Sequence, residues 1–329
     1  MSDTQRYQVL NRPPFNLRTY LLRWESILVM LLAAVIVINT IISPYFLDIY
    51  NLSDATFNFS EKAIIALAMA LLIISREIDL SVAANIAVCS LGMGLLSSMG
   101  FGTFFLVIAG LATGTFCGAV NGALVTYFRL PSLVVTIGTM SLFRGLAQVV
   151  LGDQALTKYP SGLTSFGQGY IWSGVPLPNS FALFLILACL FGFVLHRTVI
   201  GRQIFAIGHN PIAARFSGIK VEKIRFWLFV LTGLMAGIAA VLLTGRIGST
   251  RPNIALGWEL EIVTMVILGG ISIGGGTGTI FGLVLSVFIL GLTIFGLSLI
   301  NVPGIVIAIL IGALLIVSIA IPIVAAKFR

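Results

Sequence analysis

The chain has few charged residues. Lys and Arg account for 19 of its 329 residues and Asp and Glu for 11, so that charged residues make up 9%. A soluble globular domain carries about 25%, and no polar stretch here is long enough to form a separate soluble domain. Hydrophobic residues instead make up 58%, and the mean hydropathy is +1.10. The sequence therefore predicts a membrane protein.

Side chains that serve catalysis or metal binding are also scarce. The chain has two histidines and three cysteines. His196 and His209 have no nucleophile or acid placed for a catalytic triad. Cys89, Cys117 and Cys189 lie singly in apolar runs, without the spacing of metal ligands. We therefore predict no catalytic residue and no metal site.

Phosphate-binding motifs are absent as well. The sequence contains no Gly-x-x-x-x-Gly-Lys-Ser/Thr motif and no Gly-Lys pair, and its glycine-rich stretch 269–278 has no nearby lysine. We expect no cofactor bound by this chain. The net charge of +8 does not indicate nucleic acid, because the basic residues lie at the ends of apolar runs, which is typical of membrane topology.

Ten apolar runs approach the roughly 20 residues that cross a bilayer as a helix. They cover residues 26–46, 55–75, 81–99, 103–127, 131–151, 180–198, 226–246, 259–276, 278–298 and 303–325. We expect an all-α polytopic bundle of about ten transmembrane helices, forming a single domain over residues 1–329. Because glycine and polar residues interrupt several runs, the count lies between eight and ten.

The basic residues predict the orientation. Ten spans place both termini on one side of the membrane, and the segments on that side then hold most of the Lys and Arg residues. The outer segments hold only Lys62, Lys158, Arg246 and Arg251. Such a bias predicts cytoplasmic termini, with residues 1–25 as a cytoplasmic segment. Eight spans would give the same orientation, so the bias does not fix the number of helices.

The longest inner loop, residues 197–225, contains a predicted short helix. Asn210 is a good N-cap, Pro211 suits the first helical position, and Gly218 suits the left-handed residue that ends a helix. A helix over 211–217 is too short to be stable alone in water, so it needs a surface to rest on. Two interpretations remain open, a basic loop lying on anionic headgroups and a docking helix for a cytoplasmic partner.

Four stretches together carry a family resemblance. From Gly201 the inner loop reads GRQIFAIGHNPIAARFSGI, from Ile78 the chain reads IDLSV, from Leu130 it reads LPSLVVTIGT, and from Leu268 it reads LGGISIGGGTGT. In this order they resemble elements of the bacterial ABC-importer permeases for ribose, xylose, rhamnose, autoinducer-2 and related compounds. The matches extend from about residue 60 to about residue 320.

The resemblance implies a division of labour. A cytoplasmic ABC ATPase would hold ATP and Mg, a periplasmic sugar-binding protein would deliver the cargo, and a second permease chain, identical or related, would complete the path in the inner membrane. It also implies the vitamin-B12-importer-like (type II) bundle and import of a monosaccharide or related polyol-like solute, with rhamnose or autoinducer-2 favoured. An ion-coupled secondary transporter is the alternative, although the carboxylates Asp79, Glu61, Glu259 and Glu261 lie at the predicted edges of spans.

The resemblance also assigns coupling residues. The inner loop would contact the ATPase and carry its motion to the membrane. The residues that match this element are Gly201, Arg202, Gly208, Asn210, Pro211, Ala214, Arg215 and Gly218.

A second group of residues would line or hinge the transport path. They are Asp79, Ser81, Asn85, Asn121, Arg144, Gly269, Gly270, Gly275 and Gly276. Arg76 and Glu77 stand where the family usually has two glycines. Asp79 therefore either pairs with Arg76 at a helix end or helps to form the path. Arg144 lies within a span, where an arginine either serves function or binds backbone carbonyls, and Asn121 is expected to hydrogen-bond between helices.

Charged residues near the outer ends of spans are candidates for docking the binding protein. They are Lys158, Arg246, Arg251 and Glu259. The alternative is a solvated rim.

Glycines recur every fourth residue in two stretches. One stripe consists of Gly110, Gly114, Gly118 and Gly122, a second of Gly270, Gly274, Gly278 and Gly282, and Gly233 and Gly237 form a pair. Such stripes let helices approach closely in lipid, where packing rather than the hydrophobic effect joins them. We predict structural packing, with a sliding surface as the alternative.

Overall fold

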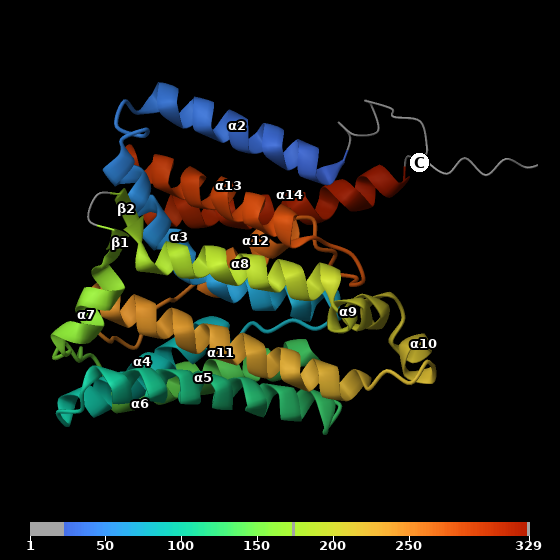
Figure 1. The fold of residues 1–329 in the computed structure, drawn as a ribbon, viewed down its shortest axis with the longest axis horizontal. Helices are drawn as coiled ribbons and strands as arrows, with labels where there is room; N and C mark the ends of the chain where they lie inside the picture. The colour runs from blue at the N-terminus through green and yellow to red at the C-terminus, as the bar shows by residue number, and fades with distance from the viewer. Residues whose placement is uncertain (1–22, 173–174, 328–329) are drawn as a thin grey trace, which may run out of the picture.

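A computed structural model describes residues 23–172 and 175–327 of the chain, and it is almost entirely helical (Figure 1). The helices are α2 Trp24–Ile42, α3 Ile49–Ile74, α4 Val82–Ser98, α5 Thr103–Thr126, α6 Ser132–Leu151, α7 Ser161–Gln168, α8 Asn179–Arg197, α9 Val199–His209, α10 Pro211–Phe216, α11 Val221–Ile247, α12 Trp258–Leu268, α13 Ile280–Leu299 and α14 Gly304–Lys327. The strands β1 Tyr170–Trp172 and β2 Val175–Pro178 form a small antiparallel hairpin. Of the expected N-terminal segment, residues 1–22 lie outside the described residues.

Seven of the described helices are long and apolar enough to cross a membrane, namely α2, α3, α5, α6, α8, α11 and α13. Two shorter apolar helices, α4 and the first part of α14, accompany them, and so does the 11-residue helix α12. Each of the ten expected runs thus contains a helix, and the all-α polytopic prediction is confirmed. Three boundaries differ by five residues or more, and one of them is the start of α11, which lies at Val221 rather than at residue 226. Helix α3 begins at Ile49, where Asp48 caps it by accepting hydrogen bonds from the N–H groups of Tyr50 and Asn51, and α12 ends at Leu268.

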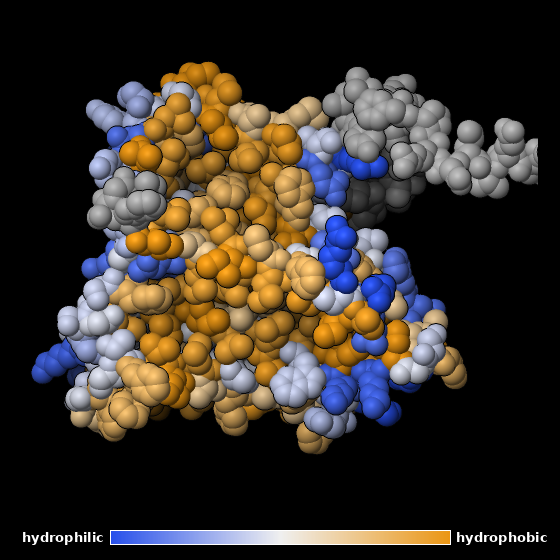
Figure 2. All heavy atoms as spheres, in the orientation of Figure 1, coloured by the Kyte–Doolittle hydropathy of each residue, from blue (hydrophilic) through white to orange (hydrophobic). Residues whose placement is uncertain are grey.

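Hydrophobic and hydrophilic surfaces separate along the helices. Figure 2 shows hydrophobic side chains across the middle of the molecule and hydrophilic ones gathered at its two ends. One end carries α9 and α10, and the opposite end carries α7, β1 and β2 (Figure 1). We call these the α10 end and the α7 end. The apolar band between them is the surface that a bilayer covers.

Helix α3 lies at the centre of the bundle. From Ala63 to Ile74 all its side chains are buried, and the helix packs against α8, α11, α12 and α13. A helix that is hydrophobic all round is buried on every side. Because α3 packs against four other helices, a segment that contacts the last turn of α3 contacts the central helix of the bundle.

Glycines bring α5 and α11 into backbone contact. A Cβ atom added at Gly114 would lie 2.5 Å from the carbonyl oxygen of Gly233 and 2.8 Å from the Cα of Gly237. The predicted packing role of the first stripe and of the glycine pair is confirmed. The second predicted stripe is wrong, because residues 269–279 form a loop between α12 and α13 and share no helix face.

This contact gives a stability prediction. Gly114→Val forces a side chain against backbone atoms of α11 that cannot rotate away, so we expect the protein to lose about 1–3 kcal/mol of stability. Gly138→Val in α6 is the matched control, because an added Cβ there meets nothing within 4 Å. Thermal unfolding of the detergent-purified variants measures both. Equal unfolding temperatures for the two variants would contradict the packing role.

Candidate functional site

The α10 end of the molecule contains the predicted short helix. Asn210 caps it, since its Oδ1 accepts hydrogen bonds from the backbone N–H groups of Ile212 and Ala213 at 3.0 Å each. Pro211 occupies the first helical position, and Gly218 adopts a left-handed φ of 83° just after the helix. The predicted helix is confirmed, although it ends one residue early, at Phe216.

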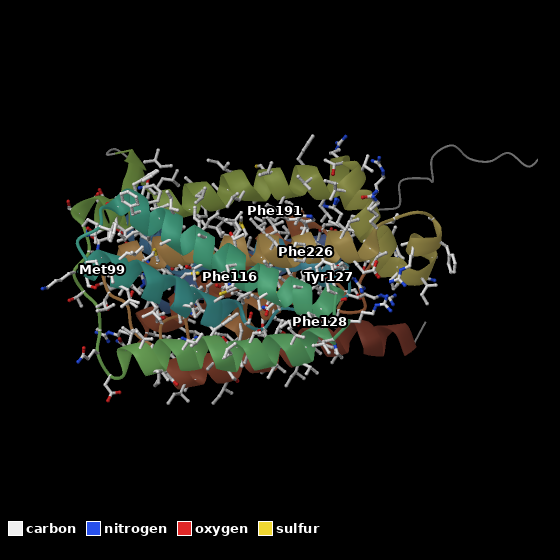
Figure 3. All side chains as sticks on the ribbon, turned by 90° about the horizontal axis from the view of Figure 1, so that it is seen from below. Met99, Phe116, Tyr127, Phe128, Phe191 and Phe226 are labelled. Carbon is white, nitrogen blue, oxygen red and sulfur yellow. The ribbon has the colours of Figure 1, made fainter. Side chains whose placement is uncertain are left out.

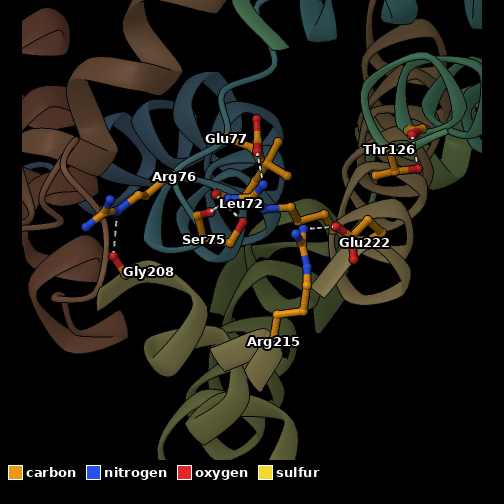
Figure 4. Close-up of polar contacts among 10 residues, drawn as sticks. Leu72, Ser75, Arg76, Glu77, Thr126, Gly208, Arg215 and Glu222 are labelled. Carbon is orange, nitrogen blue, oxygen red and sulfur yellow. Dashed lines mark hydrogen bonds and ion pairs between the residues drawn. The ribbon is translucent and has the colours of Figure 1, made fainter. Parts of the chain in front are cut away.

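Helix α10 is anchored on one side only. The buried Ala214 packs with Ile207 and Val221, and Arg215 forms an ion pair with Glu222 of α11 (Figure 4). Ile212 and Phe216, one turn apart and therefore on one face, are 65% and 90% exposed. The anchored helix thus presents two large apolar side chains outward.

The end of α9 is tied to the turn that follows α3. Arg76 donates from Nε to the carbonyl oxygen of Gly208 at 2.6 Å and from Nη2 to that of His209 at 2.9 Å. Figure 4 shows the first of these bonds. The N–H of Gly276 donates to the carbonyl oxygen of Ile74 at 2.9 Å. The turn after α3, the end of α9 and the loop at Gly276 are therefore in contact with one another, although they are far apart in sequence.

Glycines allow this interlocking. A Cβ at Gly208 would meet the carbonyl oxygen of Ile74 and the backbone of Gly276. Gly275 and Gly276 both have a φ of 78°, a left-handed conformation that favours glycine. The structure therefore brings a predicted coupling residue against two predicted hinge residues, which sequence reasoning had placed in separate groups.

The predicted alternative of an Arg76–Asp79 pair is wrong. Arg76 binds the carbonyl oxygens at the end of α9, as described above. Glu77 instead forms an ion pair with Arg225 of α11, with Nη1 and Oε1 2.9 Å apart, and Arg225 also donates to the carbonyl oxygen of Ser75 at 3.0 Å. The turn after α3 is thus held by both α9 and α11.

Asp79 belongs to a buried polar cluster. Its Oδ1 accepts hydrogen bonds from the N–H and Oγ of Ser81 at 2.9 and 2.6 Å, and Asn121 donates to the Oγ of Ser81 at 2.8 Å. Asn85 donates to the carbonyl oxygen of Gly114 at 3.3 Å. Burial holds the pKa of the Asp79 carboxyl above its ordinary value, and the hydrogen bonds from Ser81 and Asn121 offset only part of this rise. The cluster joins α4 to α5, in accord with the expected interhelical role of Asn121.

Arg144 binds backbone carbonyls, as one of the two interpretations predicted. Its Nη1 donates to the carbonyl oxygens of Pro252 and Ile254 at 2.8 and 2.7 Å. It therefore ties α6 to the connection between α11 and α12.

The remaining predicted residues are Gly201 and Arg202 in the first turn of α9, and Gly269 and Gly270 just after α12. Gly201 approaches the backbone of Leu195 where α8 meets α9, and Gly269 approaches the start of α13. Gly270 has a φ of 86° and faces the indole of Trp24. Arg202 is exposed on α9.

At the α7 end, the predicted docking residues divide into two groups. Lys158 and Arg251 are exposed and Glu259 is half-buried. Arg246, however, is bound by Glu61, with Nε–Oε1 and Nη2–Oε2 distances of 2.8 Å each.

The predicted position of Glu61 at a span edge is wrong, because Glu61 lies inside α3 and is fully buried. Asp79 lies in the turn between α3 and α4, at a span edge as predicted, but it is buried and contacts Asn121 of α5. Sequence reasoning also missed that Lys62 pairs with Glu261, at 2.5 Å. The adjacent Glu61 and Lys62 within an apolar run were the only sequence signal for the pairs Glu61–Arg246 and Lys62–Glu261.

Comparison with known proteins identifies the family. Residues 51–319 match the family described as "Branched-chain amino acid transport system / permease component". The chain belongs to this permease family. The autoinducer 2 import system permease protein LsrD of Photorhabdus laumondii is 34% identical over 302 residues, covering 90% of each chain. LsrD of Salmonella paratyphi A is 35% identical over 301 residues, covering 89% of this chain and 90% of its own. No solved structure matches the chain significantly.

Family membership confirms the central predictions. This permease is a membrane-spanning subunit of an ABC importer, a transport subunit rather than an enzyme, and a multi-pass protein of the inner membrane. The four sequence stretches therefore indicated the family correctly.

Proposed function

We propose that this permease imports autoinducer-2 or a closely related monosaccharide-like solute, handed over by a periplasmic binding protein. The support is that several relatives which align with about nine tenths of the chain are autoinducer-2 import permeases. The α10 end faces the cytoplasm in this proposal, as do both termini, because the basic residues gather there. A second permease chain, identical or related, completes the path.

The arrangement of α10 is the observation that carries the proposed coupling to an ATPase, whereas the proposed substrate rests on the relatives. The exposed face of α10, with Ile212 and Phe216, receives a cytoplasmic ABC ATPase that holds ATP and Mg. Displacement of α10 passes through α9 to Arg76 and so to the end of α3, the central helix. ATP shifts the permease only if the ATPase binds its two conformations with different affinity.

At the α7 end, the exposed Lys158 and Arg251 and the half-buried Glu259 meet the binding protein. Arg246 is not one of these docking residues, because Glu61 already holds its guanidinium. Charges at the rim of an interface mainly steer association and orient the partner.

Uptake by vesicles tests the proposal. The permease, the ATPase and the binding protein that purify with it are reconstituted, and labelled autoinducer-2, rhamnose and ribose are supplied in turn. We expect ATP-dependent uptake, fastest for autoinducer-2. Uptake that persists without ATP and stops with an uncoupler would instead show an ion-coupled transporter. Faster ATP-dependent uptake of rhamnose or ribose would overturn the proposed substrate but not the coupling.

A further inference from the structure

Two hollows flank the first turns of α11. One is a groove of about 560 Å³ between α8, α9 and α11, and the other, of about 630 Å³, lies between α11, α10 and the end of α5. Lys220, Lys223 and Trp227 line both. These three side chains therefore stand on the ridge between the hollows.

The first groove has apolar walls. Helices α8 and α11 each pack against α3, so that Leu71 of α3 lines the space between them, together with Ile204, Leu228 and Leu231. Figure 2 shows hydrophobic side chains over the region where α8 and α11 run side by side in Figure 1. This groove opens sideways, toward the surface that the bilayer covers, whereas α10 projects from the end of the molecule.

The two lysines on the ridge have no anionic partner among the described residues. Both are exposed, and neither forms an ion pair in the part of the chain that the structure describes. The nearby carboxylates are already engaged, Glu222 by Arg215 and Glu77 by Arg225. Two positive charges thus remain beside an apolar groove.

The depth of these residues corresponds to the headgroup region. Val221 begins α11, which is one of the membrane-spanning helices, so Lys220 and Lys223 lie at its membrane boundary. Trp227, which is 56% exposed, lies about one turn further along. Tryptophan is enriched at this depth because its ring is amphipathic, and basic pockets between transmembrane helices bind anionic lipid headgroups.

We propose that this groove binds an anionic phospholipid, with its phosphate between Lys220 and Lys223 and an acyl chain along Leu228 and Leu231. The site is independent of the transported solute. Both lysines flank Glu222 in sequence, and Glu222 pairs with Arg215 of α10, so the lipid would bind at the start of α11, where α10 is anchored. A soluble phosphate would leave the apolar wall of the groove unused.

Native mass spectrometry of the full-length permease, purified with its partner subunits, tests the site. Phosphatidylglycerol and phosphatidylethanolamine with identical acyl chains are titrated separately. Two lysines at the surface predict a preference for phosphatidylglycerol of roughly tenfold or more. Lys220→Gln/Lys223→Gln should remove the preference and leave phosphatidylethanolamine binding unchanged. Equal binding of the two lipids by the unaltered protein would overturn the proposal.

Two control variants locate the effect. Lys220→Arg/Lys223→Arg keeps both charges and should keep the preference. Lys158→Gln removes a charge at the opposite end and should also keep it. If Lys158→Gln lost as much of the preference as the double glutamine variant, the preference would depend on the net charge of the protein and not on this site.

Fluorescence gives a readout that does not depend on the folding of the lysine variants. The difference in tryptophan fluorescence between the unaltered protein and Trp227→Phe is the emission of Trp227. Brominated-chain phosphatidylglycerol should quench that signal at a roughly tenfold lower mole fraction than brominated-chain phosphatidylethanolamine. Equal quenching by the two lipids would overturn the proposal.

Discussion

Phe216→Asp is expected to abolish ATP-dependent uptake and leave the permease in the membrane. Phe216 is 90% exposed, so its replacement removes no internal packing. In the proposed complex it is a central apolar anchor, and such residues cost about 2 kcal/mol or more when lost, which weakens ATPase binding roughly 30-fold. Co-purification of the ATPase and uptake by vesicles measure the two effects.

Phe128→Asp is the matched control. Phe128 follows α5, is 70% exposed, and lies toward the same end of the molecule, away from α10 (Figure 3). We expect it to retain ATPase binding and uptake. Unchanged uptake in Phe216→Asp, or equal losses in both variants, would show that α10 is not the docking helix.

Two further changes measure how much of the uptake depends on α10. Deleting residues 211–217 removes the whole exposed face and should also abolish uptake. Arg215→Ala removes only an exposed ion pair with Glu222, and such pairs contribute about 0–1 kcal/mol. From its ion pair alone we therefore expect Arg215→Ala to reduce uptake only in part, so that a complete loss would indicate that Arg215 itself contacts the ATPase.

Arg246→Gln should lower the stability of the permease by about 3–5 kcal/mol, because it leaves a buried carboxylate without its partner. Glu61 is 0% exposed, and both of its carboxylate oxygens accept hydrogen bonds from Arg246 at 2.8 Å. The pair joins α3 to the end of α11. Thermal unfolding of the detergent-solubilised protein, followed by tryptophan fluorescence, measures the loss.

The double variant Glu61→Gln/Arg246→Gln tests the cause. It removes both charges, so we expect it to be more stable than Arg246→Gln alone. Arg251→Gln removes an exposed arginine at the same end and should change stability little. If the double variant were less stable than the single variant, the unpaired charge would not explain the loss.

Some features of this chain follow from residues close together in sequence. Each of the ten apolar runs contains a helix, and seven of these helices are long and apolar enough to cross a bilayer, because hydropathy over about 20 residues decides whether a helix can span it. Asn210, Pro211 and Gly218 predicted α10, because a cap acts on N–H groups two or three residues away. The same locality explains the error at residues 269–279, where glycine spacing was interpreted as a helix face although the left-handed residues Gly270, Gly275 and Gly276 break the helix.

The tertiary structure decided how the parts meet. Arg76 lies three residues from Asp79, yet it binds carbonyl oxygens at Gly208 and His209, 132 and 133 positions away. Glu61 and Arg246 are separated by 185 positions. The sequence by itself therefore determined the family, the membrane-spanning segments and the short helix α10. Only the folded chain decided which charges are paired, because the partner of a buried charge is set by the packing of helices in three dimensions.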